Sequence, residues 1–264
     1  MKNLYKSNYN KYPAIDIKGH HCSKGWHEVI RNILKHLVTL KKDKMVIAIE
    51  CYHGVYANEI MRNIMDLVRP TLTVDASIAL KKENEINVLV DEYVTEDPVF
   101  GFITPLALHE FFNESIIQSL QKDIAKIESG IIVVVGTGAS FICPQPELLI
   151  YADMPRWEIQ LRFRKNRVSN LGARNETAEF SYQYKRSYFV DWRVCDRHKR
   201  TLINSCVFFL DTTIENSPGL VSATAMKDAL KSFAHRPFRL VPFFDPGPWG
   251  GQWLKEVCDL PRDE

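Results

Sequence analysis

Residues 50–60 combine residue types and a spacing that are typical of phosphate chemistry. They follow an apolar run over residues 45–49 and lead into a helical pattern. A phosphate-binding loop in this position holds phosphate with backbone N–H groups and a lysine, and it holds Mg²⁺ with a hydroxyl. Here Ala57 stands at the lysine position and Asn58 at the hydroxyl position. The stretch therefore predicts a phosphate loop that lacks two side chains of phosphoryl transfer.

Two interpretations of this loop stay open. In the first, it is a retained phosphate or sugar-phosphate pocket made of backbone N–H groups, with Gly54, Tyr56 and Asn58 as ligand-binding residues. In the second, it is a strand-to-helix turn kept for folding, in which Gly54 supplies a positive φ. Full kinase activity is disfavoured, because loss of the lysine removes the point charge on the transferred phosphate.

Two further segments place polar groups at strand ends. Asp75 closes the strand expected over residues 72–75, where it is either a catalytic general base for an acceptor hydroxyl or the N-cap of the next segment. Gly136 and Gly138, in a Gly-Thr-Gly-Ala-Ser turn, are either ligand-binding or part of a tight loop after a buried strand.

Arginines after the fourth expected strand are candidate phosphate ligands, because a guanidinium binds phosphate bidentately. They are Arg156, Arg162, Arg164, Arg167 and Arg174. We favour Arg156, which follows the strand directly. At most one of Arg162 and Arg164 faces the site, because residues two apart lie on different faces of a helix, and Arg162 can pair with Glu158. Arg186, with Lys185 and Arg193, lies on the next helix and is expected to close over a ligand.

The pattern of strands and helices predicts the architecture that positions these groups. Apolar strands are expected at residues 45–51, 72–75, 131–135, 148–152 and 207–210, with a further short strand at 14–17. Helices are expected at residues 24–41, 56–68, 85–94, 106–127, 156–166, 182–202 and 222–234, with Ser23 as the first N-cap and a polar, mobile stretch at 167–180. This alternation predicts an α/β fold with a doubly wound, mostly parallel sheet, whose ligands bind beyond the carboxyl ends of the strands.

Composition excludes several classes of protein. The 264 residues contain no apolar run near the roughly 20 residues that span a bilayer, so we expect no membrane partner. The net charge of +2 argues neither for nor against nucleic acid, and we expect no nucleic-acid partner. Six separated cysteines without a CxxC favour reduced, buried thiols, and the absence of a leader pattern favours a cytoplasmic location.

Two other groups of residues have less specific patterns. His20, His21, Cys22 and His27 have no second ligand cluster at zinc spacing, so we expect no metal site. The aromatics of residues 182–192 lie among Lys and Arg and can stack bases, but their helical spacing favours packing with snorkelled cations.

The order of elements over residues 45–212 resembles uridine kinase and phosphoribulokinase-like P-loop proteins. This resemblance implies a three-layer P-loop nucleoside-kinase-like sandwich, an acid near the acceptor hydroxyl at Asp75, and an arginine-rich lid over residues 151–164. It also implies ATP and Mg²⁺ as cofactors if the chain is an active kinase. The missing lysine and hydroxyl depart from the family, as does the lack of a clear acid after the third strand.

The tail has a second resemblance. Residues 237–256, with Trp249-Gly250-Gly251 after an apolar strand and a proline, are similar to the opening of class I mannose-6-phosphate isomerases. The whole resembles the N-terminal, kinase-like module of longer bacterial proteins of that type. The domains expected are an N-terminal extension and helix (1–43), a degenerate P-loop kinase-like domain (44–235) and the start of a cupin domain (236–264). The isomerase's zinc ligands would follow on a cupin domain, in cis or in trans.

Two functions are consistent with these patterns. The first is a module of sugar-phosphate metabolism that binds a phosphorylated sugar or nucleotide without efficient phosphoryl transfer. The second is an active small-molecule phosphotransferase, in which Asp75 is the base and Arg156 and Arg186 hold the phosphates.

Overall fold

The computed structural model describes residues 14–235 and 257–259. The chain divides into two compact units, residues 19–226 and a unit formed by residues 1–18 and 227–264. In the second unit, residues 14–17 form no strand, contrary to the prediction, and residues 227–234 belong to helix α9 (Ala223–Ala234). The isomerase-like residues 237–256 lie outside the described residues. The candidate site lies in the first unit.

Seven strands in the described part of the chain form one sheet with the order β1-β7-β6-β5-β2-β4-β3. They are β1 (Ser23–Lys24), β2 (Lys44–Cys51), β3 (Leu72–Asp75), β4 (Gly130–Gly136), β5 (Leu148–Asp153), β6 (Phe208–Asp211) and β7 (Gly219–Ser222).

Five of these strands, β2 to β6, are parallel, and β2 lies at their centre. It pairs with β4 on one side and β5 on the other, with Ala48 opposite Val134 and Leu149. After β2 the chain forms β3 two positions away in the sheet, and β4 then occupies the position between them. The chain next forms β5 and β6 on the other side of β2. β7 and β1 extend the sheet in antiparallel pairing. The mostly parallel, doubly wound α/β sheet is thus confirmed.

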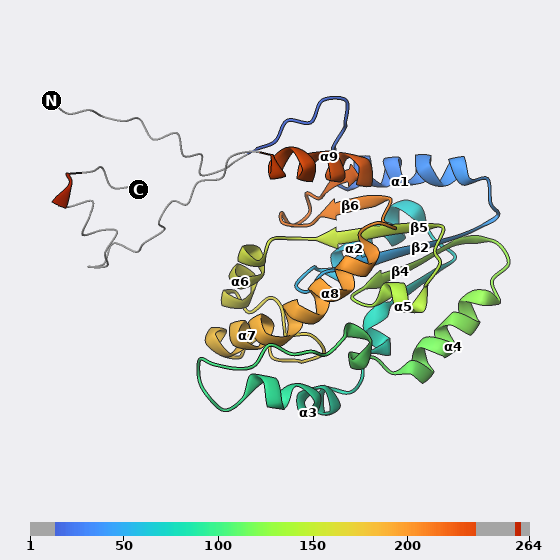
Figure 1. The fold of residues 1–264 in the computed structure, drawn as a ribbon. Helices are drawn as coiled ribbons and strands as arrows, with labels where there is room; N and C mark the ends of the chain where they lie inside the picture. Colours follow the sequence, from blue (N-terminus) through green and yellow to red (C-terminus); the bar gives the residue numbers. More distant parts are fainter. Residues whose placement is uncertain (1–13, 236–256, 260–264) are drawn as a thin grey trace. The chain divides into compact units, whose positions relative to one another are not determined.

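Helices cover both faces of the sheet (Figure 1). They are α1 (Trp26–Leu40), α2 (Ala57–Val68), α3 (Glu83–Val94), α4 (Glu114–Ala125), α5 (Ala139–Ile142), α6 (Arg156–Arg164), α7 (Phe180–Arg186) and α8 (Trp192–Leu202). Two 3₁₀ turns, η1 (Ala76–Ala79) and η2 (Leu108–Phe111), and one π-helical turn, η3 (Ser187–Asp191), complete the described elements.

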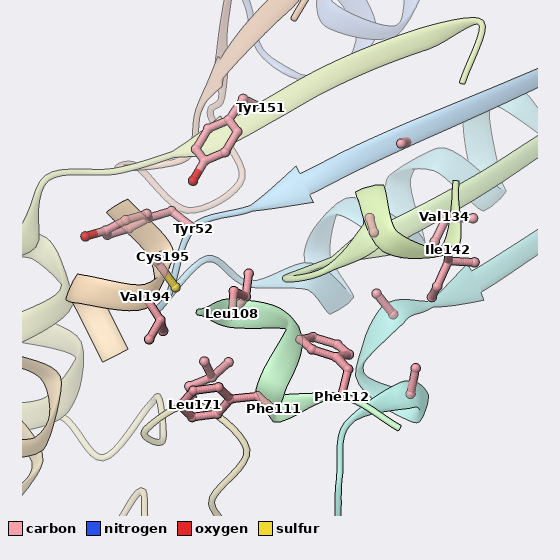
Figure 2. Packing of buried hydrophobic residues seen from close by; sticks show 14 of the residues in the cluster. Tyr52, Leu108, Phe111, Phe112, Val134, Ile142, Tyr151, Leu171, Val194 and Cys195 are labelled. Atoms are coloured by element: carbon pink, nitrogen blue, oxygen red, sulfur yellow. The ribbon is translucent and has the colours of Figure 1, made fainter. Parts of the chain in front are cut away.

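Alternate side chains of the buried strands point to opposite faces of the sheet and pack in two separate cores. Ile47 and Ile49 of β2 pack with α1 and α2 on one face. Val46 and Ala48 of the same strand pack on the other face with α3, α4, α6 and α8. Figure 2 shows part of this second core, with Tyr52 beside Cys195 of α8. A sheet buried on both faces explains why the parallel strands are almost wholly apolar.

Some predicted helix boundaries were wrong. The helix expected over residues 106–127 is broken into η2 and α4, because Asn113 caps α4 by accepting from the N–H groups of Ser115 and Ile116. The expected helix 182–202 contains the π turn η3. Ser23 lies in β1 and is not the N-cap of α1, which is Gly25.

The stretch 167–180, expected to be mobile, is partly buried and hydrogen bonded. Asn170 is 2% exposed and donates to Asp191 Oδ2 at 2.7 Å and to the Gln183 carbonyl at 3.0 Å. Other polar side chains of the segment bond to one another nearer the surface, as Ser169 does to Glu176 at 2.6 Å.

No described helix is both long and apolar enough to cross a membrane. Among the cysteines, Cys51, Cys143, Cys195 and Cys206 are buried and free, whereas Cys22 and Cys258 are free and exposed. Burial raises the pKa of the Cys143 thiol to about 12 and that of the Cys206 thiol to about 11.

Candidate functional site

A cleft of about 770 Å³ lies at the carboxyl ends of β2 and β3, against the first turn of α2. Its wall includes Gly54, Tyr56 and Asn58 of the loop and Asp75 of β3. Arg62 and Arg167 also line it. Parallel strands direct their carboxyl ends to one edge, which explains why residues far apart in sequence meet here.

The loop between β2 and α2 leaves several backbone donors without a protein acceptor. Gly54 has φ +87°, so the positive φ expected there is confirmed. The N–H groups of Val55 and Ala57 bond inside the loop. Those of Gly54, Tyr56 and Asn58 donate to no acceptor among the described residues. Unpaired N–H groups at a helix N-terminus favour an anion, because the helix dipole adds positive potential there.

Arg162 contacts this loop but is not among the residues that line the cleft. Its guanidinium is buried, donates to the Gly54 and Thr212 carbonyls at 2.9 Å each, and lies 3.8 Å from the centre of the Tyr56 ring. It also pairs with Glu158 at 3.2 Å, as the i,i+4 spacing predicted. All these contacts are within the protein, so Arg162 positions the loop.

Asp75 occupies the cap position that its sequence context allowed. Its Oδ1 accepts from the Ser77 N–H at 2.8 Å and thereby caps η1. Oδ2 accepts no hydrogen bond from the described residues. The cap interpretation is confirmed, and one carboxylate oxygen remains available on the wall of the cleft.

Arg167 lines the cleft and has no side-chain partner among the residues that the structure describes. Arg62 donates to Asn216 Oδ1 at 3.2 Å. The exposed guanidinium of Arg167 makes no hydrogen bond or ion pair with any residue that the structure describes. Glu59, which also lines the cleft, accepts a hydrogen bond from the Trp26 indole N–H to its Oε1 at 3.0 Å. Arg167 is therefore the side chain best placed to neutralise a bound anion, although Arg156 was favoured from the sequence.

The turn containing Gly136 and Gly138 holds an anion that belongs to the protein itself. Glu50, at the end of β2, is 1% exposed and accepts from the Gly138 N–H at 2.6 Å and the Ser140 N–H at 2.8 Å. His198 Nε2 lies 3.6 Å from its Oε2. These donors are occupied, so the turn is not open to a phosphate. An acid at the end of a buried strand was the sequence signal for such an internal partner.

Two more arginines predicted to bind ligand are engaged elsewhere. Half-buried Arg156 pairs with Asp196 and lies 5.1 Å from the centre of the Trp192 ring. Arg186 is 1% exposed, donates to Asn87 Oδ1 and the Leu171 carbonyl at 2.9 Å each, and lines no part of the cleft. The structure therefore brings Gly54, Tyr56, Asn58 and Asp75 together, and it does not bring these arginines to them.

His53, in the same loop, is a buried neutral imidazole that the sequence did not single out. Its Nε2 lies 2.9 Å from the Ser169 carbonyl, which can only accept, so Nε2 carries the proton. Nδ1 is buried and has no hydrogen-bond partner in the described part of the chain, and Asp191 Oδ2 lies 3.9 Å from Nε2. Burial lowers the pKa of His53 from its ordinary 6.5, and Asp191 opposes this shift only in part.

This lowered pKa predicts acid destabilisation. Below pH 6.5 the unfolded chain takes up a proton at His53 that the folded chain binds less well. The free energy of unfolding should therefore fall as the pH drops from about 6.5, by up to about 1.4 kcal/mol per pH unit. Urea unfolding between pH 5 and 8 measures the slope, which His53→Gln should reduce and the exposed His27→Gln should leave unchanged. An equal slope in all three proteins would contradict the assignment.

Within the described residues, no group of three or more His, Cys, Asp or Glu side chains is arranged to hold a metal ion.

Comparison with known proteins identifies a family and similar solved structures. The model of a family described as a domain of unknown function, DUF8485, matches residues 25–235. No curated protein matches the sequence. Among solved structures, a shikimate kinase from Bacteroides thetaiotaomicron is similar, with a TM-score of 0.40 and 10% identity over 72% of this chain and 96% of that one. A likeness this weak does not indicate a function.

Proposed function

The chain belongs to the DUF8485 family, and we propose that its cleft binds a small phosphorylated molecule, a sugar phosphate or a nucleotide, without efficient phosphoryl transfer. The observation that carries this proposal is the meeting of three unpaired backbone N–H groups and an unpaired arginine, Arg167, in one cleft. N–H groups at a helix N-terminus and a guanidinium are the donors that phosphate prefers in proteins.

The donor set does not fit Mg²⁺–ATP as a P-loop kinase holds it. Ala57 and Asn58 are the first two residues of α2, where the lysine and the metal-binding hydroxyl would stand. Arg167 supplies charge, but it lies on the loop after α6 and not on the first turn of α2. We therefore expect the cleft to bind a phosphorylated molecule without fast phosphoryl transfer, because that transfer needs a cation and a metal ion held on the transferred phosphate.

A phosphotransferase remains the second candidate, and the position of Asp75 favours it. Its free Oδ2 lies on the wall of the same cleft, where a base for an acceptor hydroxyl would be needed. Turnover of ATP with an acceptor that is abolished by Asp75→Asn, while Ser77→Ala keeps it, would establish this candidate. No turnover with any acceptor leaves binding as the function.

The association with sugar-phosphate metabolism is supported by the sequence of the tail. Trp249-Gly250-Gly251 is similar to the opening of mannose-6-phosphate isomerases, and we propose a cupin isomerase domain as a partner in cis or in trans and the cytoplasm as the location. Mannose 6-phosphate is accordingly the first sugar phosphate to test.

Arg167→Ala should weaken binding about 10- to 100-fold, because a charge-assisted hydrogen bond contributes about 1.5–3 kcal/mol. The measurement is the unfolding midpoint against concentration of mannose 6-phosphate, ribose 5-phosphate, AMP, ADP and inorganic phosphate. A ligand at about 100 times its Kd stabilises the folded state by about 2.7 kcal/mol, which is about 5–11 °C for a unit of this size.

Arg174→Ala is the matched control for this experiment. Arg174 is exposed on the same loop but does not line the cleft, so its loss should leave the ligand-induced shift unchanged. Equal losses in both variants would indicate only a general effect of charge. The absence of a shift with every ligand would contradict the proposed function.

A further inference from the structure

A protruding loop after α3 exposes four large apolar side chains within five residues. We call residues 95–103 the apolar tip. Exposed fractions are 64% for Val99, 71% for Phe100, 67% for Phe102 and 58% for Ile103. Single exposed apolar residues are ordinary on a protein surface, but a contiguous group of this size marks an interaction site.

The apolar tip is held in shape by its own hydrogen bonds. Asp97 Oδ1 accepts from the N–H groups of Val99 at 2.7 Å and Phe100 at 2.6 Å. The Thr95 hydroxyl donates to the Phe100 carbonyl at 2.8 Å, and the buried ammonium of Lys185 donates to the carbonyls of Thr95 and Asp97. A loop built in this way presents its phenylalanines without a large ordering cost on binding.

Acidic residues lie on the tip and on the end of α3 that leads into it. Asp91, Glu92, Glu96 and Asp97 are all exposed, and residues 91–103 contain no lysine or arginine. The N–H groups of Phe100 and Val99 hold the pKa of Asp97 below its ordinary value, so it is charged at neutral pH. The tip therefore fits an apolar surface with a basic rim.

Helix α1 provides such a surface on the same chain. Two adjoining hollows, of about 450 Å³ and about 710 Å³, flank the helix, one reaching Leu67 of α2 and the other Ile131 of β4, and they share Leu34 and Val38. Val38 is 76% exposed. We call this the α1 groove. Its charged lining residues are Arg31, Lys35, Lys41, Lys42 and Asp43.

The tip and the groove belong to opposite faces of the sheet. Ile86 and Val90 of α3, which leads into the tip, pack in one core. Val29 and Ile33 of α1 pack in the other. Figure 1 shows α1 and α3 on the two sides of the strands. A tip therefore cannot reach the groove of its own chain, and complementary surfaces that face apart lead to contact between copies.

We propose that the apolar tip of one copy docks in the α1 groove of a second copy, so that chains associate head to tail. Two acids of the tip and two at the end of α3 meet four basic side chains on the groove, and phenylalanines cover Leu34 and Val38. Contact between two tips or two grooves brings like charges together. An anionic membrane repels the acidic tip for the same reason.

Sedimentation velocity of the full chain tests this association, from about 1 μM to about 1 mM, a range that brackets weak complexes. The tip variant carries Phe100→Asp and Phe102→Asp, and the groove variant carries Val38→Asp and Lys35→Glu. The wild type should grow beyond a dimer with concentration, because each added copy leaves a free tip and a free groove. Each variant alone should associate at least about 10-fold more weakly.

Mixing the two variants gives the decisive result. The groove variant keeps an intact tip and the tip variant keeps an intact groove, so the mixture should form a one-to-one dimer and stop there. Val88→Asp, on the exposed side of α3 outside both surfaces, should assemble as the wild type does. Circular dichroism should show folded protein in every case, because the substituted side chains are exposed.

Three outcomes would overturn the proposal. They are a wild type that stays monomeric over the whole range, variants that assemble as the wild type does, and a mixture that fails to dimerise. Binding of the wild type, but not of the tip variant, to phosphatidylserine vesicles would assign the tip to membranes and would also overturn it.

Discussion

Replacing Glu50 with alanine should lower the midpoint of thermal unfolding by about 6–20 °C. The carboxylate is 1% exposed and is the acceptor for two N–H groups of the turn at Gly138 and Ser140. Removing the partner of buried polar groups costs about 3–5 kcal/mol, and each kcal/mol lowers the midpoint by about 2–4 °C in a unit of this size. Calorimetry of the full chain measures the shift.

An added anion should partly rescue this variant. In Glu50→Ala the turn has free N–H donors beside His198, so sulfate or phosphate should recover part of the lost stability by entering the vacated place. Glu128→Ala is the control, because Glu128 is exposed and its loss should change the free energy of unfolding by less than about 0.5 kcal/mol. A loss for Glu50→Ala as small as that of the control would show that the turn needs no internal anion.

The parallel part of the fold could be predicted because its signal is local. Strand β2 and strand β4 are continuous apolar runs, and a run of that kind is buried on both sides wherever it lies. The antiparallel strands β1 and β7 were missed. They are two and four residues long. β1 forms by pairing Ser23 with Leu220, nearly two hundred residues away, and β7 also pairs with β6.

The candidate site likewise has a part that the sequence predicts and a part that depends on long-range contacts. Asn58 and Asp75 meet because both follow parallel strands, and that rule needs only the order of elements. The partners of the arginines depend on contacts that no spacing reveals. Arg156 pairs with Asp196, on a helix that begins with Trp192, and Glu50 fills a turn 88 residues away. The order of elements therefore predicts which residues share this edge of the sheet. It does not predict which arginines there already have partners within the protein.

Arg162→Ala should cost about 3–5 kcal/mol of folding free energy and abolish the ligand-induced shift. The substitution leaves the Gly54 and Thr212 carbonyls without a donor and removes the contact with the Tyr56 ring. The loop whose N–H groups line the cleft then loses its main attachment to α6. Urea unfolding with and without the best phosphorylated ligand measures both effects.

Two further variants separate this attachment from charge alone. Arg162→Lys should recover little, because one ammonium cannot replace the planar fork that reaches two carbonyls and covers a ring. Arg164→Ala removes an exposed guanidinium that lies 3.8 Å from the centre of the Phe180 ring, so it should cost only about 0.5–1 kcal/mol and keep the ligand shift. If Arg162→Ala stayed as stable as Arg164→Ala, the loop would be held by its backbone alone. Its open N–H groups would then reflect a turn kept for folding, and the case for a phosphate site would fall with it.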